Sequence, residues 1–275
     1  MSYQTGTDHL LCEIDDGVAT FTFNRPEKKN AIGNELTPAL RQGLHDLELR
    51  TDVRCIMLTG AGNAFCSGGD VSGMGGSAPS ADADAPKPST ADRVRTLQHG
   101  QNTLTLRIHQ LEKPVIAALP GAAAGAGFSI AVACDLRVAS ESAFLVTAFR
   151  NIGVSGDYGG SWNLTQLLGT AKAKELYFLS ERVSAQDALA LGLVNQVFPD
   201  ESFRTDALAY AKRIAHGPTA AIRYMKKNIN HAADSSLASA LDLEAEHMVR
   251  AFQTDDSKEA IRAFQEKRQP TFKGR

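Results

Sequence analysis

The alternation of short apolar strands with amphipathic helices constrains the fold of this chain more than any other sequence feature. Residues 10–14 and 18–23 are apolar or β-branched runs that flank Asp15-Asp16-Gly17, so we expect a β-hairpin there. A helix is expected next, because four leucines recur at helical spacing: Leu36, Leu40, Leu44 and Leu47. A compact apolar run at 53–58 then predicts a buried strand.

The same alternation continues along the next part of the chain. The pattern predicts, in order, a helix at 93–111, a strand at 115–119, a helix of small residues at about 125–133 and a strand at 136–139, followed by a short apolar run at 143–146. Strands that alternate with helices in this way need crossover connections. The order therefore predicts an α/β fold.

Helical patterns dominate the chain from Tyr158 onward. They lie at 162–168, 171–179, 185–191, 203–215, 219–230, 237–252 and 257–267. We therefore expect an α/β core at 1–200 and a C-terminal helical region at 201–275. Residues 72–91 have no apolar period and are rich in Gly, Pro, Ser and Asp, which predicts a mobile loop.

Charge and hydrophobicity narrow the possible partners. The formal net charge is −2 and the pI is about 6.4, so we expect no nucleic-acid partner. The longest apolar stretch, 114–133, is interrupted by Pro120 and by Gly121, Gly125 and Gly127, so we expect no membrane span. The N-terminus lacks a basic region followed by an apolar one, so we expect no signal peptide and a cytoplasmic location.

Several common catalytic patterns are missing from the sequence. Gly121, Gly125 and Gly127 do not have the G-x-G-x-x-G spacing of a dinucleotide site. Ser129 lacks the final glycine of a nucleophile elbow and a matching Asp-then-His pair, so we interpret it as a buried helix residue. The seven histidines are scattered and the four cysteines form no C-x-x-C pair, so we expect no metal site and no disulfide.

Two glycine-containing segments, 64–71 and 120–127, each follow a predicted buried strand. Glycine lets the backbone approach a ligand closely, and N–H groups where a loop becomes a helix can bind an anion or an oxyanion. The alternative is that these small residues serve only close packing. For either segment alone, packing would be the better interpretation.

Five motifs, taken in their order, resemble those of the crotonase (enoyl-CoA hydratase/isomerase) superfamily over nearly the whole chain. They are N-R-P-E-K-K-N-A at 24–31, A-F-C-S-G-G-D-V at 64–71, K-P-V-I-A-A-L-P-G at 113–121 with C-D-L at 134–136, G-V-S-G-D-Y-G-G-S at 153–161, and S-E-R-V-S-A at 180–185 with G-L-V-N at 192–195. The resemblance implies a spiral of ββα turns followed by helices that trimerise. It implies a homotrimer, or a hexamer made of two trimers.

The resemblance also implies a site for an acyl-CoA thioester. The Gly69 and Ala126 N–H groups would form an oxyanion hole for the enolate, where losing one donor typically costs about 10²–10³ in rate. Phe264 and Lys267, with Phe252 nearby, would approach the CoA site of a neighbouring subunit, and the loop 72–91 would order over the acyl-CoA. The CoA phosphates would lie near Arg25, Lys28 and Lys29. The other implied CoA-binding residues are Asn30, Ala31, Ala64, Ser67, Gly69, Asp70, Val71 and Ser72. No cofactor is implied besides the CoA that the substrate carries.

The sequence departs from the hydratase pattern at both acid positions. Hydratases of this family use two glutamates, and matching the motifs places Ser129 and Phe149 at those positions. Neither side chain is a general base at neutral pH. Asp157 instead matches a position where isomerase-like members carry one acid that moves a proton between carbons two and four. The resemblance therefore implies double-bond isomerisation with Asp157 as the acid and base.

Several alternatives remain open from the sequence. Asp157 could cap the helix expected near Tyr158, because Asp is a preferred N-cap residue. It could also attack the acyl group covalently, as in a dehalogenase-type member. The chain could be an ordinary enoyl-CoA hydratase that converts a 2-enoyl-CoA to a 3-hydroxyacyl-CoA. It could finally be a non-catalytic protein of the CoA-binding fold that binds a partner or RNA.

Overall fold

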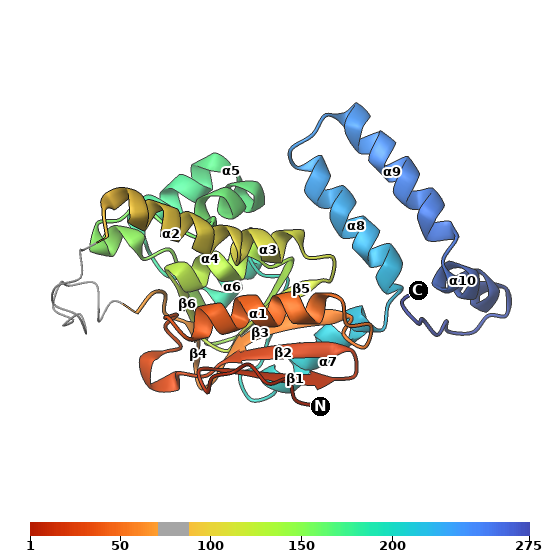
Figure 1. Ribbon diagram of the computed structural model, residues 1–275, viewed down its shortest axis with the longest axis horizontal. Coiled ribbons are helices and arrows are strands. Elements are labelled where there is room, and N and C mark those ends of the chain that lie inside the picture. The colour runs from red at the N-terminus through yellow and green to blue at the C-terminus, as the bar shows by residue number, and fades with distance from the viewer. Residues whose placement is uncertain (71–87) are drawn as a thin grey trace.

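A computed structural model describes residues 1–70 and 88–275 (Figure 1). Residues 71–87 lie outside this described part. They include Val71 and Ser72 of the expected CoA site and most of the predicted loop 72–91, so those predictions stay untested. The described chain has the mixed α/β architecture that the sequence predicts, with two sheets in the core and a helical C-terminal region (Figure 1).

The larger sheet has six strands in the order β1-β2-β3-β5-β7-β10. Its strands are β1 Leu10–Asp15, β2 Val18–Phe23, β3 Cys55–Gly60, β5 Val115–Leu119, β7 Leu136–Ser140 and β10 Gln196–Phe198. The first two form the expected antiparallel hairpin, in which Leu10 lies opposite Phe23. Each of the other neighbouring pairs is parallel, as the crossover argument requires.

A second sheet has the order β4-β6-β8-β9 and carries the glycine-containing segments. Its strands are β4 Ala64–Cys66, β6 Ala122–Ala124, β8 Phe144–Val146 and β9 Val183–Ser184. The parallel pairing of β4 with β6 brings together two segments that are far apart in the sequence. We did not predict β4, β6, β9 or β10, because a strand of two or three residues is too short to show an alternating pattern.

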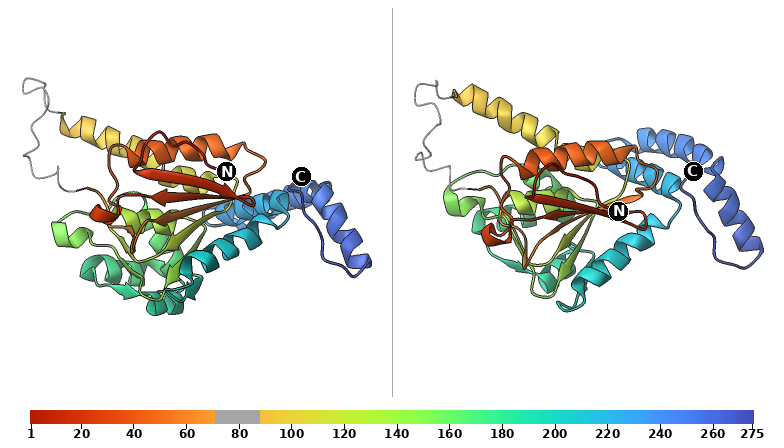
Figure 2. Two further views of the ribbon diagram at one scale, coloured as in Figure 1. Left: turned by 90° about the horizontal axis from the view of Figure 1, so that it is seen from below. Right: turned by 60° about the horizontal axis from the view of Figure 1, so that its bottom comes forward.

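Helices cover both faces of the larger sheet (Figures 1 and 2). Helices α1 Leu36–Glu48, α3 Thr105–Gln110 and α4 Ala126–Ala133 contribute to the core cluster on one face, and α7 Phe203–Ala215 forms the cluster on the other. Successive residues of β3 alternate between them, with Ile56 in the first cluster and Met57 in the second. This explains why β3 is a continuous apolar run: both of its faces are buried.

Two helical predictions needed correction. The helix expected at 93–111 is two helices, α2 Thr90–Asn102 and α3, separated at Thr103 and Leu104. The Thr103 hydroxyl and N–H both donate to the His99 carbonyl, which ends α2, while Leu104 turns into the core. The helices expected at 162–168 and 171–179 are one element, α5 Gly160–Leu179, bent at Gly169 where φ is +73°.

The C-terminal helices extend away from the core (Figures 1 and 2). Helices α8 Thr219–Ala232 and α9 Leu237–Phe252 lie side by side, followed by α10 Asp255–Gln265 at the end of the molecule opposite α2. An ion pair of 2.8 Å between Lys226 and Asp135 joins α8 to the core. Large apolar side chains are exposed on these helices: Ile229, Leu237, Met248, Val249, Phe252 and Phe264. Nothing within the described chain covers them.

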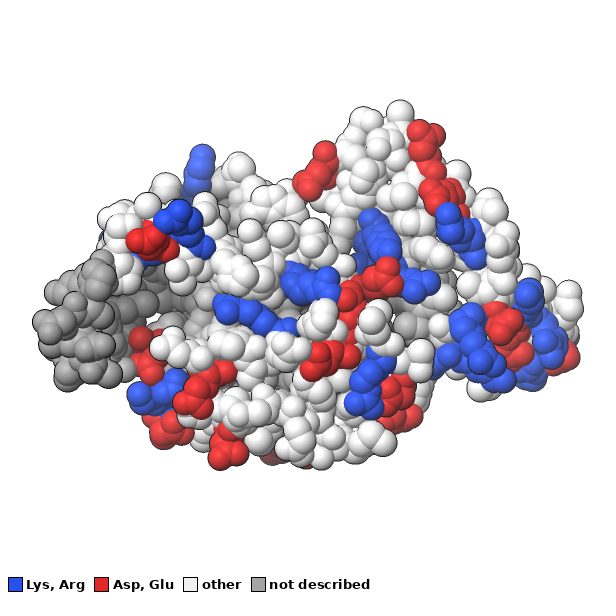
Figure 3. All heavy atoms as spheres, viewed as in Figure 1, with Lys and Arg blue, Asp and Glu red and all other residues white. Residues whose placement is uncertain are grey.

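Charged groups on the surface are mixed in sign. Figure 3 shows basic and acidic side chains together around α10, where Arg268 pairs with Glu259 and with Glu266. Among the described residues, none of the helices combines the length and the hydrophobicity that a membrane span requires. The described residues also contain no group of three or more His, Cys, Asp or Glu residues that could hold a metal ion.

Candidate active site

The two glycine-containing segments meet where β4 ends and α4 begins. A Cβ atom built on Gly68 would lie 3.2 Å from the Ala124 carbonyl oxygen and 3.5 Å from the Ala126 nitrogen. Gly68 also has a φ of +104°, which side chains other than glycine rarely adopt. Only a glycine therefore allows this close approach. The segments that looked like separate packing features in the sequence form one site.

Two backbone N–H groups at this junction have no acceptor within the described residues. Gly69 forms a parallel bridge with Ile32, in which the Ile32 N–H donates to Gly68 and the Asp70 N–H donates to Ile32. This pattern turns the Gly69 N–H away from Ile32. Ala126 is the first residue of α4, and the first N–H groups of a helix have no partner inside the helix. These are the two donors that the family resemblance implies for an oxyanion hole, a role that stays a prediction.

Helix α4 is held tightly against β4, which positions the Ala126 N–H. All eight residues of α4 are buried. A Cβ atom on Gly127 would lie 2.3 Å from the Cys66 carbonyl oxygen, so glycine is required at this position. The positive end of the helix dipole lies at Ala126 and favours a negative charge there. The junction can therefore bind an oxyanion with donors that are already oriented.

The loop at 24–33 is fastened to β4 by buried polar contacts. The Asn30 side chain accepts a bond from the Arg25 N–H and donates to the carbonyl oxygens of Ala61 and Ala64, with distances of 2.7–2.9 Å. Arg25 is itself buried and its guanidinium donates to Asp70 at 3.1 Å. Asn30 and Arg25 therefore organise the loop, while Ala31 and Ala64 contribute buried backbone.

Exposed groups of the same loop remain suitable for CoA phosphates. Lys28 lies 3.2 Å from the Asp70 carboxylate, and Lys29 donates to Asn63 at 2.9 Å. Both lysines and Ser67 are exposed, and the Ser67 hydroxyl donates to the Lys28 carbonyl oxygen. Because Arg25 is buried and paired, the structure favours Lys28 and Lys29 over Arg25 for phosphate contact. Phosphate binding itself stays a prediction.

Asp157 lies in a glycine-rich turn that packs against α4. A Cβ atom on Gly160 would lie 2.3 Å from the Ser129 hydroxyl oxygen, and Ser129 lies one turn into the helix that begins at Ala126. Burial raises the pKa of Asp157 to about 6, and no other charged group of the described chain contributes to this shift. Its Oδ1 atom is buried without a hydrogen-bond partner among the described residues.

Asp157 does not cap the following helix. Helix α5 begins at Gly160, its N-cap is Gly159 with φ of +71°, and no side chain bonds to the helix end. The helix-cap interpretation is therefore wrong. A half-buried carboxylate with an elevated pKa and one buried, unpaired oxygen is the kind of group that accepts and returns a proton.

The two side chains that the resemblance matches to the hydratase glutamates, Ser129 and Phe149, lie beside the 156–160 turn. Ser129 is fully buried in α4, as expected, and its hydroxyl is directed to the Gly125 carbonyl oxygen at 3.4 Å. Phe149 is buried and stacks on Tyr177 with ring centroids 5.9 Å apart. Sequence reasoning missed Tyr177, because an aromatic residue in a helical pattern is indistinguishable from a core residue.

Phe264 and Lys267 do not approach the junction within one chain. Phe264 belongs to α10 at the far end of the molecule, and Lys267 follows that helix (Figure 1). The expected contact with CoA can therefore come only from another copy of the chain.

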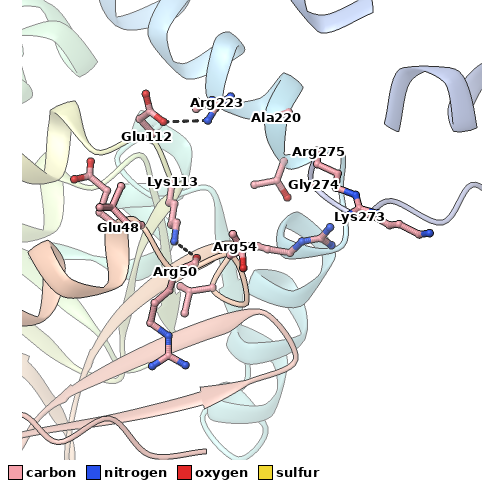
Figure 4. Close-up of a pocket in the computed structure, with 14 residues that line it drawn as sticks. Glu48, Arg50, Arg54, Glu112, Lys113, Ala220, Arg223, Lys273, Gly274 and Arg275 are labelled. Carbon is pink, nitrogen blue, oxygen red and sulfur yellow. Dashed lines mark hydrogen bonds and ion pairs between the residues drawn. The ribbon is translucent and has the colours of Figure 1, made fainter. Parts of the chain in front are cut away.

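Two surface cavities lie away from these residues. One of about 560 Å³, in Figure 4, includes Lys113, Arg223 and Arg275 in its lining, and Lys113 donates there to the Arg50 carbonyl oxygen at 2.6 Å. The other, of about 670 Å³, lies among α3, α5 and α8. Neither is lined by Gly69, Ala126 or Asp157. Burial lowers the pKa of Lys113 to about 8, but this lysine already donates to two carbonyl oxygens.

The chain is similar to known proteins over nearly its whole length. The sequence profile of the family described as enoyl-CoA hydratase/isomerase matches residues 13–275. The chain is 35% identical over 268 residues to the 1,2-epoxyphenylacetyl-CoA isomerase of Escherichia coli strain K12, covering 98% of this chain and 99% of the relative. It is 36% identical over 275 residues to a probable enoyl-CoA hydratase of Rhodobacter capsulatus, with both chains fully covered.

Solved structures show the same fold. A putative enoyl-CoA hydratase from Streptomyces coelicolor matches with a TM-score of 0.88 and 34% identity, covering 99% of this chain and 97% of the other. An enoyl-CoA hydratase from Polaromonas sp. JS666 matches with a TM-score of 0.87 and 33% identity, covering 96% and 99%. With the family profile and these relatives together, the chain belongs to the crotonase superfamily and is an enzyme of the enoyl-CoA hydratase/isomerase family.

Proposed function

We propose that this enzyme moves a double bond in an acyl-CoA thioester, with Asp157 as the single acid and base. The observation that carries the proposal is the environment of Asp157, whose pKa burial raises to about 6 while the hydratase acid positions hold Ser129 and Phe149. Such a carboxylate is ionised at neutral pH yet basic enough to take a proton. One group suffices, because the proton taken from carbon two can be returned to carbon four.

The proposed reaction passes through an enolate held by the Gly69 and Ala126 N–H groups. Removing a proton next to the thioester places negative charge on its carbonyl oxygen, and two fixed donors stabilise that charge as it forms. The CoA moiety would lie along the loop 24–33, with its phosphates near Lys28 and Lys29. No cofactor besides the CoA of the substrate takes part.

The relatives support the class of reaction without deciding between its members. One relative is named as an isomerase and others as enoyl-CoA hydratases. Hydration requires one group that activates water and another that protonates the carbon next to the thioester. By motif matching, Asp157 is the one carboxylate at a family acid position. This favours isomerisation over hydration for this chain, and the enzyme family favours catalysis over a pure binding role.

Heavy-water labelling tests the proposal directly. On incubation with a 3-enoyl-CoA in heavy water, we expect the 2-enoyl product with deuterium at carbon two or four and no added water, measured by mass spectrometry. The rate should fall as the pH drops through about 6, because protonated Asp157 is no longer a base. Conversion of a 2-enoyl-CoA to a 3-hydroxyacyl-CoA at ordinary enzymatic rates would instead show a hydratase.

We also propose that the working unit is a trimer, or two trimers in a hexamer. The exposed apolar side chains of α8, α9 and α10 would be buried between copies, and Phe264 and Lys267 would then reach the CoA site of a neighbour. Light scattering should give at least three times the chain mass of 29.4 kDa. The double variant Met248→Asp/Val249→Asp should dissociate the assembly and lose activity.

A matched control for the trimer is Leu11→Asp, at an exposed apolar position on the edge strand β1. We expect this variant to keep the mass and activity of the wild type. A fully active monomer would rule out the trimer as the working unit.

A further inference from the structure

Two buried polar atoms beside the Asp157 turn have no hydrogen-bond partner among the described residues. They are Oδ1 of Asp157 and the hydroxyl of Tyr177 in α5. A buried polar atom without a partner loses its hydration and gains nothing in return, so such atoms are rare in folded proteins. Two of them lie beside one turn, one an acceptor and one a donor, and both require an explanation.

The turn is shaped around the Tyr177 hydroxyl. Gly156 and Gly160 lie on either side of Asp157, and Cβ atoms built on them would lie 3.4 Å and 2.7 Å from the Tyr177 oxygen. A side chain at position 160 would therefore collide with this hydroxyl. Stacking on Phe149 fixes the ring, with an interplanar angle of 14°. The hydroxyl is thus held beneath the residue that we propose as the base.

The two groups have complementary protonation states. Burial, with a smaller contribution from the Asp157 charge, raises the pKa of Tyr177 to about 12, so its hydroxyl remains a donor at neutral pH. Asp157, with its pKa near 6, is an acceptor there. A hydrogen bond to the charged form of a carboxylate holds its orientation and favours that form.

The other groups packed around Asp157 do not supply such a donor. Ser129 of α4 is directed to the Gly125 carbonyl oxygen. Phe149 has no polar atom. The neighbouring Tyr158 has its N–H bonded to Gln101 of α2, while its hydroxyl interacts with Arg41 of α1. Within residues 1–70 and 88–275, Tyr177 is the tyrosine whose hydroxyl is buried without a hydrogen-bond partner.

We infer that Tyr177 is a positioning residue, whose hydroxyl donates a hydrogen bond to Oδ1 of Asp157 in the substrate complex and leaves Oδ2 to move the proton. This inference rests on the proposed role of Asp157. The two groups are close enough for the Asp157 charge to raise the pKa of Tyr177, and a rotation of the Asp157 side chain on substrate binding would bring the two atoms into hydrogen-bonding distance. Tyr177 is half-buried, with its hydroxyl buried under the turn, so in this proposal it acts on the orientation and proton affinity of the base.

The variant Tyr177→Phe tests this inference because it removes the hydroxyl and keeps the ring stacked on Phe149. We expect kcat to fall by about 10-fold with KM unchanged, since the base loses its alignment while the binding site stays intact. The midpoint of the acid limb of the pH–rate profile should rise by about one unit, since the charged carboxylate loses a donor. Tyr210→Phe, which removes a tyrosine hydroxyl from α7 on the opposite face of the sheet, should change neither quantity.

A carboxyl-carbon NMR titration of Asp157 gives the same comparison without turnover. The midpoint should lie higher in Tyr177→Phe than in the wild type, both saturated with a non-reactive acyl-CoA analogue. An unchanged midpoint would overturn the inference, even if kcat fell, because packing alone would then explain the loss. The proposed function has its own test: if Asp157→Asn is inactive while Tyr177→Phe is normal, the role of Asp157 stands and only that of Tyr177 is wrong.

Discussion

Replacing Asp157 with Asn should lower turnover by about 10²–10⁴-fold, the usual effect of losing a general acid and base. Asn keeps the size of the side chain and most of its hydrogen-bonding capacity but cannot take a proton. The fold and the affinity for acyl-CoA should therefore persist. Steady-state kinetics with a 3-enoyl-CoA, together with calorimetric titration of a non-reactive acyl-CoA analogue, would measure the two properties separately.

The same variant should be more stable than the wild type at pH 7. Burial raises the pKa of Asp157 to about 6, so the folded chain holds this proton more tightly than the unfolded chain does. The ionised carboxylate is consequently destabilising above pH 6, by about 1–2 kcal/mol after allowance for its partial exposure to solvent. The advantage of Asn should shrink as the pH falls from 6 toward 4, where the wild-type carboxyl is protonated.

Asp200→Asn provides a matched control, since Asp200 is exposed and bonds to Ser142 away from the junction. Its turnover should equal that of the wild type. Undiminished turnover in Asp157→Asn would contradict the proposed mechanism and would require another base.

Replacing Gly68 with Ala should lower kcat by about 10²–10³-fold, the effect of losing an oxyanion donor. The new Cβ atom would lie 3.2 Å from the Ala124 carbonyl oxygen and 3.5 Å from the Ala126 nitrogen, so the backbone at Gly68 must move a few tenths of an ångström away from Ala124 to admit it. That shift moves the Gly69 and Ala126 N–H groups relative to each other. Single-turnover kinetics would show the loss in the chemical step.

The backbone strain of this substitution needs a control of its own. Gly192 also has a positive φ, of +79°, and a Cβ atom there would meet nothing within 4 Å. Gly68→Ala and Gly192→Ala should each destabilise the fold by about 1 kcal/mol through their positive φ. Only Gly68→Ala should lose activity. Equal activity of the two variants would argue against an oxyanion hole at this junction.

Much of the fold could be predicted because its elements carry local signals. The hairpin, the leucine spacing of α1 and the long amphipathic helices α7 and α9 follow from periodicity alone. The break between α2 and α3 could not be predicted in this way. It depends on the burial of Leu104 in the core, which is a tertiary contact.

The residues of the candidate site were predicted from the order of family motifs and not from periodicity. Motif order led to Gly69, Ala126 and Asp157, and the structure places Asp157 against the helix that begins at Ala126. The structure also places the buried Arg25 side chain in an ion pair with Asp70, whereas the resemblance implied that Arg25 lies near the CoA phosphates.

The sequence by itself determined the order of the longer strands and helices, the presence of two glycine-containing segments after buried strands, and the family. These depend on side-chain periodicity, on backbone conformation and on motif spacing, which are properties of neighbouring residues. The tertiary structure decided that the two glycine-containing segments lie against each other, that Oδ1 of Asp157 is buried without a partner among the described residues while Asp157 does not cap α5, and that the Tyr177 hydroxyl lies against the same turn. Burial and hydrogen bonding depend on segments distant in the chain, such as β4 against α4 and α5 against the 156–160 turn, and no local pattern records them.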